Sequence, residues 1–396
     1  MNKAKLVNNR ILIKKKSIHK MIMHFLFILL LLYAAKDVLY SAGSISQSVL
    51  LIHLSLSSFY FFKTVFHQRN NVFYKTWTTL LLLNVIGFLF TGNINNPTSL
   101  GMFLGVLISL LTFYPFYFFA YKGILGSNNL ILFLFLMLFI SISQYIHNIS
   151  TIFYESGNTD IVNNVSFMFV NLIPYVFLIK KNRILSFGMM FIIMIFVVQG
   201  AKRGAIITGL SGVFLFIYYM FKTTNKKYKK LNYLIIMTVS FLILNYLYNL
   251  FTSNEFLLYR FENMFSSGGS GRDIIYKNII NHWYNTDSFF KLMFGFGFSS
   301  SVDITGTYAH NDWLELLSNF GIFGVSIYLW LFITGFKLLI KKKCIEDLKY
   351  VFLATIIIWF ITTLFSMGYT SAEGYMRAVI IAFVIGFTQK DASKTQ

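Results

Sequence analysis

The chain has 396 residues, of which 56% are hydrophobic and only 12% are charged. Its formal net charge of +20 at pH 7 would suit a nucleic-acid-binding protein only if a soluble basic face carried it. Apolar runs of about 20 residues, the length that a helix needs to cross a bilayer core of ~30 Å, recur instead along the whole chain. This pattern excludes an ordinary soluble domain and predicts an all-α integral membrane protein, because a helix satisfies its own backbone hydrogen bonds within lipid.

About twelve membrane spans are predicted between the polar breaks. In chain order they cover residues 21–35, 45–66, 76–91, 100–121, 129–147, 161–179, 184–199, 203–221, 231–250, 312–340, 350–366 and 375–388. A basic segment precedes the first span, and we interpret this span as uncleaved because no clear small-residue cleavage site follows it. Three regions result: spans one to nine with a basic N-terminus (1–250), one long external loop with short amphipathic helices (251–311), and the last three spans with a polar tail (312–396).

The distribution of charge predicts the orientation. With the N-terminus in the cytoplasm, most of the 34 Lys and Arg residues fall on the inner side and most of the 14 acidic residues on the outer side. Both termini are then cytoplasmic, and the loop 251–311 is external. The single cysteine, Cys344, is expected on the cytoplasmic side, so no disulfide framework exists.

Two arginines stand at positions that suit a bound anion. Arg203 follows Lys202 at the outer start of a predicted span, and its planar guanidinium suits bidentate contact with phosphate oxygens. The alternative role for Arg203 is an anchor on lipid headgroups. Arg272 is expected in the first turn of a short amphipathic helix on the membrane. The dipole at a helix N-terminus disfavours a cation, so an arginine at this position suggests a functional role. The alternative is a loop arginine that pairs with Asp273.

A histidine lies at the end of the external loop, in "HNDWLELLSNFGIFG". His310 and Asn311 precede Asp312 and Glu315, whose spacing predicts a capping-box start of a helix. An imidazole at such a position can exchange a proton near neutral pH. A hydrogen-bonding role at the membrane interface is the alternative. We expect no metal site here, because Asp312 and Glu315 are explained as caps and no second histidine is close by in sequence.

These segments resemble the O-antigen polymerase and ligase superfamily of bacterial membrane glycosyltransferases. The resemblance is carried by "KRGA" opening a span, then "GRDIIYKNII", "FGFGFSS" and the histidine segment, in that order. The last piece fits the family pattern of His, then Asn, Ser or Gln, nine residues, Gly, two residues and Gly, here His310, Asn311, Gly321 and Gly324. The resemblance implies a glycosyltransferase C-like fold of about twelve spans.

The resemblance also implies a reaction. The substrates would be a glycan donor on undecaprenyl diphosphate and a glycan acceptor, at the outer face of the bacterial cytoplasmic membrane. Arg203 and Arg272 match the arginines thought to hold the diphosphate, and His310 matches the residue thought to position or deprotonate the acceptor hydroxyl. Residues expected to support the site are Asn311, Lys202 and Arg377. No cofactor, metal or nucleic acid is implied, and the chain lacks the Asp-x-Asp pair of metal-dependent transferases.

Several functions remain open from the sequence. A polymerase joins lipid-linked repeat units, and we favour it for an O-antigen, a capsule or an exopolysaccharide. A ligase, which transfers the finished glycan to lipid A core or to protein, would use the same donor. A flippase for lipid-linked oligosaccharides and a non-catalytic scaffold for polysaccharide assembly are further alternatives. Besides membrane lipids, the expected partners are a flippase and a chain-length regulator.

Overall fold

The computed structural model describes residues 3–39, 43–66, 71–156, 162–224, 229–262, 271–340 and 346–392. These residues form helices joined by loops, and no strand occurs among them. The helices of the N-terminal half are α1 (Lys3–Ala34), α2 (Lys36–Leu39), α3 (Ser44–Val65), α4 (Val72–Thr91), α5 (Pro97–Leu111), α6 (Phe113–Tyr121), α7 (Ser127–Ser156), α8 (Ser166–Val176) and α9 (Arg183–Gln199). Those of the C-terminal half are α10 (Arg203–Lys222), α11 (Lys229–Thr252), α12 (Glu255–Glu262), α13 (Arg272–Tyr284), α14 (Phe289–Phe294), α15 (Ser300–Thr305), α16 (Asp312–Ile340), α17 (Glu346–Phe365) and α18 (Gly374–Ala392).

Nine helical segments within the described ranges are long and apolar enough to cross a membrane. They are Ser17–Ala34, Ser44–Val65, Val72–Thr91, Pro97–Tyr121, Ser127–Tyr154, Arg203–Lys222, Tyr233–Thr252, Asp312–Ile340 and Leu348–Phe365. The prediction of an all-α, multi-pass membrane protein is therefore confirmed. The three other predicted spans correspond to α8, α9 and α18. Of these, α8 and α9 are apolar but shorter, with 11 and 17 residues.

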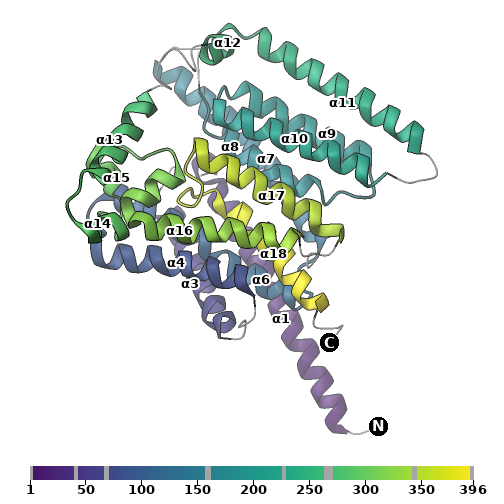
Figure 1. Cartoon of the computed structure of the whole chain (residues 1–396). Helices are drawn as coiled ribbons and strands as arrows, with labels where there is room; N and C mark the ends of the chain where they lie inside the picture. The colour runs from purple at the N-terminus through teal and green to yellow at the C-terminus, as the bar shows by residue number, and fades with distance from the viewer. Residues whose placement is uncertain are drawn as a thin grey trace.

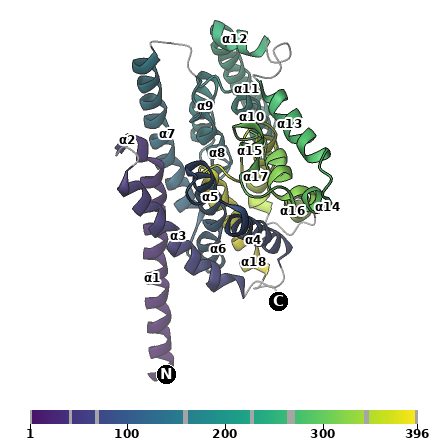
Figure 2. The same ribbon diagram turned by 90° about the vertical axis from the view of Figure 1, so that its left-hand side faces the viewer.

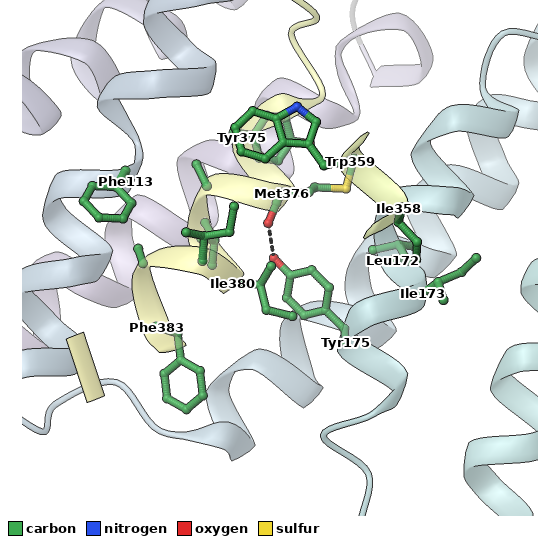
Figure 3. Close-up of a cluster of buried hydrophobic side chains, with 14 of the residues drawn as sticks. Phe113, Leu172, Ile173, Tyr175, Ile358, Trp359, Tyr375, Met376, Ile380 and Phe383 are labelled. Carbon is green, nitrogen blue, oxygen red and sulfur yellow. Dashed lines mark hydrogen bonds between the residues drawn. The ribbon is translucent and has the colours of Figure 1, made fainter. Parts of the chain in front are cut away.

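Helix α18 forms the centre of the core. It packs against α5, α6, α8 and α17, and its residues 374–386 are all buried. Figure 3 shows the cluster around its first turns, where the hydroxyl of Tyr175 on α8 donates a hydrogen bond of 2.6 Å to the carbonyl oxygen of Met376. The ring of Trp359 from α17 lies in the same cluster. A helix surrounded in this way is held by packing on every side.

The two ends of the described chain lie at the same end of the helices. In Figure 1 both termini are at the lower right, whereas α13, α14 and α15 lie on the left, at the other ends of α4 and α16. Figure 2 shows α1 at the edge of the molecule, where it packs against α3 and α7. The short helices of the region 251–311 therefore gather away from the termini.

Helix α16 is broken at Gly321. The backbone angles of this residue are φ 60° and ψ −156°, a combination that residues with a side chain essentially never adopt. A Cβ at this position would also lie 2.5 Å from the carbonyl carbon of Met293 in α14. Gly321 therefore interrupts the helix and also allows the close approach of α14.

The segment after α14 binds the carbonyl groups at the break. In an unbroken helix the carbonyls of Ser318 and Asn319 would accept hydrogen bonds from residues four positions later. Here the carbonyl of Ser318 accepts from the amide of Phe296 at 2.8 Å, and that of Asn319 accepts from the amide of Gly297 at 3.2 Å. The turn "FGFGF" therefore completes the hydrogen bonding of the broken helix.

We expect Gly321→Ala to destabilise the protein, because alanine strains this backbone by ~1–3 kcal/mol and its Cβ contacts the backbone of α14. Gly188→Ala in α9 is the matched control, since a Cβ there meets nothing within 4 Å. The measurement is the unfolding temperature of the two variants purified in detergent. Equal unfolding temperatures would contradict the role of Gly321.

Candidate functional site

Asn311 caps the N-terminus of α16. Its side-chain oxygen accepts hydrogen bonds from the amides of Trp313 at 2.9 Å and Leu314 at 3.2 Å. The expectation that Asp312 and Glu315 form the cap is therefore wrong. An asparagine at the N-cap satisfies the first-turn amides by itself, and both carboxylates are turned to other partners.

The carboxylate of Asp312 is fully buried and joins α16 to the loop before α18. It accepts hydrogen bonds from the hydroxyl of Tyr328 at 2.6 Å and from the amides of Gly368 at 2.6 Å and Tyr369 at 3.2 Å. The charge of Arg377 acts on the same carboxylate, and its guanidinium donates to the carbonyl of Gly368. Because a buried charge needs such partners, this network fixes where α16 begins.

Glu315 is also fully buried and holds the chain just before His310. Its carboxylate accepts a hydrogen bond of 3.0 Å from the amide of Ala309. It also accepts bonds from the hydroxyl of Ser301 at 2.6 Å and from the side-chain amide of Asn319 at 3.2 Å. Glu315 thus links α15, the residue before the histidine and the first half of α16.

His310 lies between Ala309 and Asn311, two residues whose positions are fixed by hydrogen bonds. Its φ of 52° places it in the left-handed region, which is uncommon for a residue with a side chain. The amide of Ala309 is held by Glu315 on one side, and Asn311 is held as the helix cap on the other. Such a backbone persists where the surroundings over-determine it, and it occurs often at functional sites. The side chain of His310 is half-buried.

Arg272 and Asn311 bind the same helix end. Arg272, the first residue of α13, donates from Nη1 to the carbonyl of Phe365 at 2.8 Å, and the side-chain amide of Asn311 donates to the carbonyl of Leu364 at 3.3 Å. Both carbonyls belong to the last turn of α17, where helix carbonyls lack partners within the helix and attract cations. This shared contact brings α13 beside the start of α16.

The start of α10 lies at the same end of α17. A Cβ at Gly204 would be 2.7 Å from the Cβ of Phe365, so the two helices are in close contact there. Lys202 precedes α10, and its ammonium group donates a hydrogen bond of 2.7 Å to the side-chain oxygen of Asn164. Lys202, Arg203 and Arg272 are all partly exposed.

Electrostatic interactions join these residues into one cluster. Burial lowers the pKa of His310 below its ordinary value, and the positive charges of Arg272 and Lys202 lower it further. The charge of Arg272 also acts on Arg203. These charges link four of the predicted residues, Lys202, Arg203, Arg272 and His310, and the fifth, Asn311, shares the end of α17 with Arg272. The sixth, Arg377, is only 4% exposed and supports Asp312 behind them.

Three helices begin at this cluster. Arg203, Arg272 and Asp312 are the first residues of α10, α13 and α16. The N-terminus of a helix carries a partial positive charge and points amide donors outward, which favours a bound anion. At α10 and α13 the N-cap residues, Lys202 and Gly271, make no side-chain cap hydrogen bond. The cluster is thus suited to an anion with several oxygen atoms, such as a phosphate.

The described residues contain no group of three His, Cys, Asp or Glu side chains arranged to hold a metal ion. Near His310, the oxygens of Asp312 and Glu315 accept the hydrogen bonds given above. In comparisons with known proteins, no family model and no curated protein matches this chain.

Sequence reasoning missed the residues that position the site. The contacts of Asp312 and Glu315 with residues 301, 309 and 368 depend on the three-dimensional arrangement, and no local pattern in the sequence indicates them. The carbonyls at the end of α17 carry no side-chain signal at all. A single clue was available, since two acidic residues in an apolar segment require buried partners.

We expect Glu315→Ala to lower the stability of the protein, since each buried donor left without an acceptor costs roughly 1–3 kcal/mol. Glu315→Gln should lose less, because its side-chain oxygen can still accept from the amide of Ala309. The exposed carboxylate of Asp303 in α15 provides the control Asp303→Ala. Thermal unfolding in detergent measures the three variants. The assignment fails if Glu315→Ala and Asp303→Ala unfold at the same temperature.

Proposed function

We propose that this chain is a bacterial membrane glycosyltransferase of the O-antigen polymerase and ligase type, and that it polymerises glycan repeat units carried on undecaprenyl diphosphate. The observation that supports this most is the gathering of Lys202, Arg203 and Arg272 around His310. These residues come from three separate segments, and the four side chains suit one anion and one proton transfer. The order of motifs in the sequence supports the same family.

The proposed reaction needs two groups of different chemistry. A hydroxyl oxygen of the acceptor sugar attacks the anomeric carbon of the donor glycan, and His310 accepts the hydroxyl proton. The bond between the anomeric carbon and the diphosphate oxygen breaks, and its electron pair leaves with undecaprenyl diphosphate. Arg203 and Arg272 hold this diphosphate and compensate the negative charge that it gains. Because the pKa of His310 is lowered, its imidazole is neutral at neutral pH and is able to accept the proton.

We further propose about twelve membrane crossings, with α8, α9 and α18 as the three beyond the nine long helices. Both termini would be cytoplasmic, and the cluster around His310 would face the outer side of the cytoplasmic membrane. The positions of the termini and of α13 to α15 at opposite ends of the helices support this orientation (Figure 1). The acceptor and donor glycans would then be reached from the compartment in which the polymer grows.

The first test replaces His310 with alanine in a strain that lacks the native gene. We expect His310→Ala to abolish long surface glycans while the protein remains in the membrane, because the group proposed to accept the acceptor proton is lost. The measurement is the surface glycan profile resolved by chain length. Exposed His147 on α7 provides the matched control His147→Ala, which should restore the wild-type profile.

The profile of His310→Ala also separates the alternatives. Single repeat units on the surface without long chains support a polymerase, whereas long chains that accumulate on undecaprenyl diphosphate indicate a ligase. An unchanged profile would overturn the catalytic role of His310. If Arg203→Ala and Arg272→Ala abolish the glycan while His310→Ala does not, lipid binding without chemistry is the better explanation.

The second test uses the pH dependence of glycan transfer by the purified protein. Transfer should fall at acidic pH as His310 becomes protonated, and the midpoint of this fall should lie below the ordinary pKa of histidine. Lys202→Gln keeps both arginines and removes a positive charge that acts on His310, so the pKa of His310 should rise and the acidic limb should move to higher pH. Lys277→Gln, at an exposed position of α13, is the control. Identical acidic limbs in the two variants would contradict the electrostatic contact.

A further inference from the structure

A short segment between α11 and α16 lies further into the helix bundle than the adjacent ends of α4 and α16. This segment comprises α14 and the turn to Phe298, residues 289–298. Its Met293 lies against the break at Gly321, nine residues or about 13 Å along α16 from its first residue. Phe320, the residue before the break, lies against α4, because a Cβ at Gly87 would touch its ring, and Gly87 is four residues, or about 6 Å, before the end of α4. The break that the segment contacts is therefore at the level of the last turn of α4, within two helices long enough to span a membrane.

The segment exposes phenylalanine rings rather than polar groups. Phe289, Phe290 and Phe294 are 69%, 74% and 52% exposed. The ring of Phe294 lies 5.6 Å from that of Phe323, which is exposed on α16 itself. Leu89 and Phe90 at the end of α4 are exposed as well. Since α4 and α16 are among the nine long apolar helices, the exposed face of the segment continues a surface that contacts lipid.

The amides at the end of the segment are bound by neighbouring parts of the protein. The amides of Phe296 and Gly297 donate to carbonyls at the break in α16, and the amide of Phe298 donates to the hydroxyl of Thr91 at 2.8 Å. Non-helical backbone is tolerated at membrane depth where other parts of the protein supply its hydrogen bonds. The turn "FGFGF" meets that condition.

One charged residue belongs to the exposed part of the segment. Lys291 is exposed, and its ammonium group lies 5.6 Å from the centre of the Phe296 ring. A lysine at this depth can extend its apolar stem along lipid and place its charge at the headgroups. The exposed position of Lys291 is therefore consistent with a shallow location of the segment in one leaflet.

We propose that residues 289–298 form a re-entrant segment that inserts into the acyl-chain layer of one leaflet, with Phe289, Phe290 and Phe294 in contact with lipid tails. The segment enters and leaves the membrane on the side where α13, α15 and the start of α16 lie. This inference does not rest on the proposed glycosyl transfer. It differs from the expectation that the whole region 251–311 is an external loop.

The test places one spin label at Phe290. In a Cys344→Ser background, which contains no other cysteine, Phe290→Cys is labelled with a nitroxide. The full chain is reconstituted in vesicles of phosphatidylcholine and phosphatidylglycerol. The collision rates of the label with oxygen, which concentrates in lipid, and with a water-soluble nickel chelate are then measured. Phe323→Cys on α16 is the lipid control, and Asp303→Cys on α15 is the water control.

We expect the label at position 290 to collide more with oxygen than with the nickel chelate, as at position 323, and the order to be reversed at position 303. A label at 290 that behaves like the one at 303 would place α14 in water and overturn the proposal. A label that neither reagent reaches would indicate a second copy of the chain on this face, which also overturns it. Phe289→Cys repeats the measurement, so that a local distortion at one position cannot decide the result.

Discussion

Two backbone hydrogen bonds allow a membrane-spanning helix to be broken. A carbonyl group without a partner costs several kcal/mol in lipid, so a break inside a span requires donors from elsewhere in the protein. The amides of Phe296 and Gly297 supply them to the carbonyls of Ser318 and Asn319. The axis of the first nine residues of α16 can therefore differ in direction from the axis of the rest of the helix. Their position is set instead by what they contact, and His310 stands directly before them.

The charges at this half-helix are divided between two layers. Behind it, the carboxylates of Asp312 and Glu315 are fully buried, and their oxygens accept hydrogen bonds from neighbouring segments. In front of it, Arg272 and Lys202 are partly exposed, and their charges act on His310. Bringing cations together costs free energy that a bound anion would recover. The structure therefore stabilises the position of the helix with acidic groups and leaves the exposed side positive.

The sequence predicted the helices better than it predicted how they meet. Long apolar runs can be recognised locally, and each predicted span overlaps a helix of the structure. The N-cap was assigned one residue too late, since Asp312 and Asn311 both suit that position and only the geometry separates them. The break at Gly321 escaped detection because a glycine in an apolar helix is equally compatible with close packing. The convergence of Lys202, Arg272 and His310 depends on contacts between segments about 40 to 110 residues apart, which no local pattern encodes.

The cluster cannot be separated from the helices that carry it. Lys202 and Arg203 belong to the start of α10, and Arg272 donates to the carbonyl of Phe365 at the end of α17. The first half of α16, which follows His310, is fixed by the loop before α18. Helix α18 is itself the centre of the core. The proposed anion binding and proton transfer would need each part placed within about 0.5 Å. In this chain the residues of the cluster are positioned by the ends of α10, α16 and α17, so the region between α11 and α16 would not reproduce the cluster on its own.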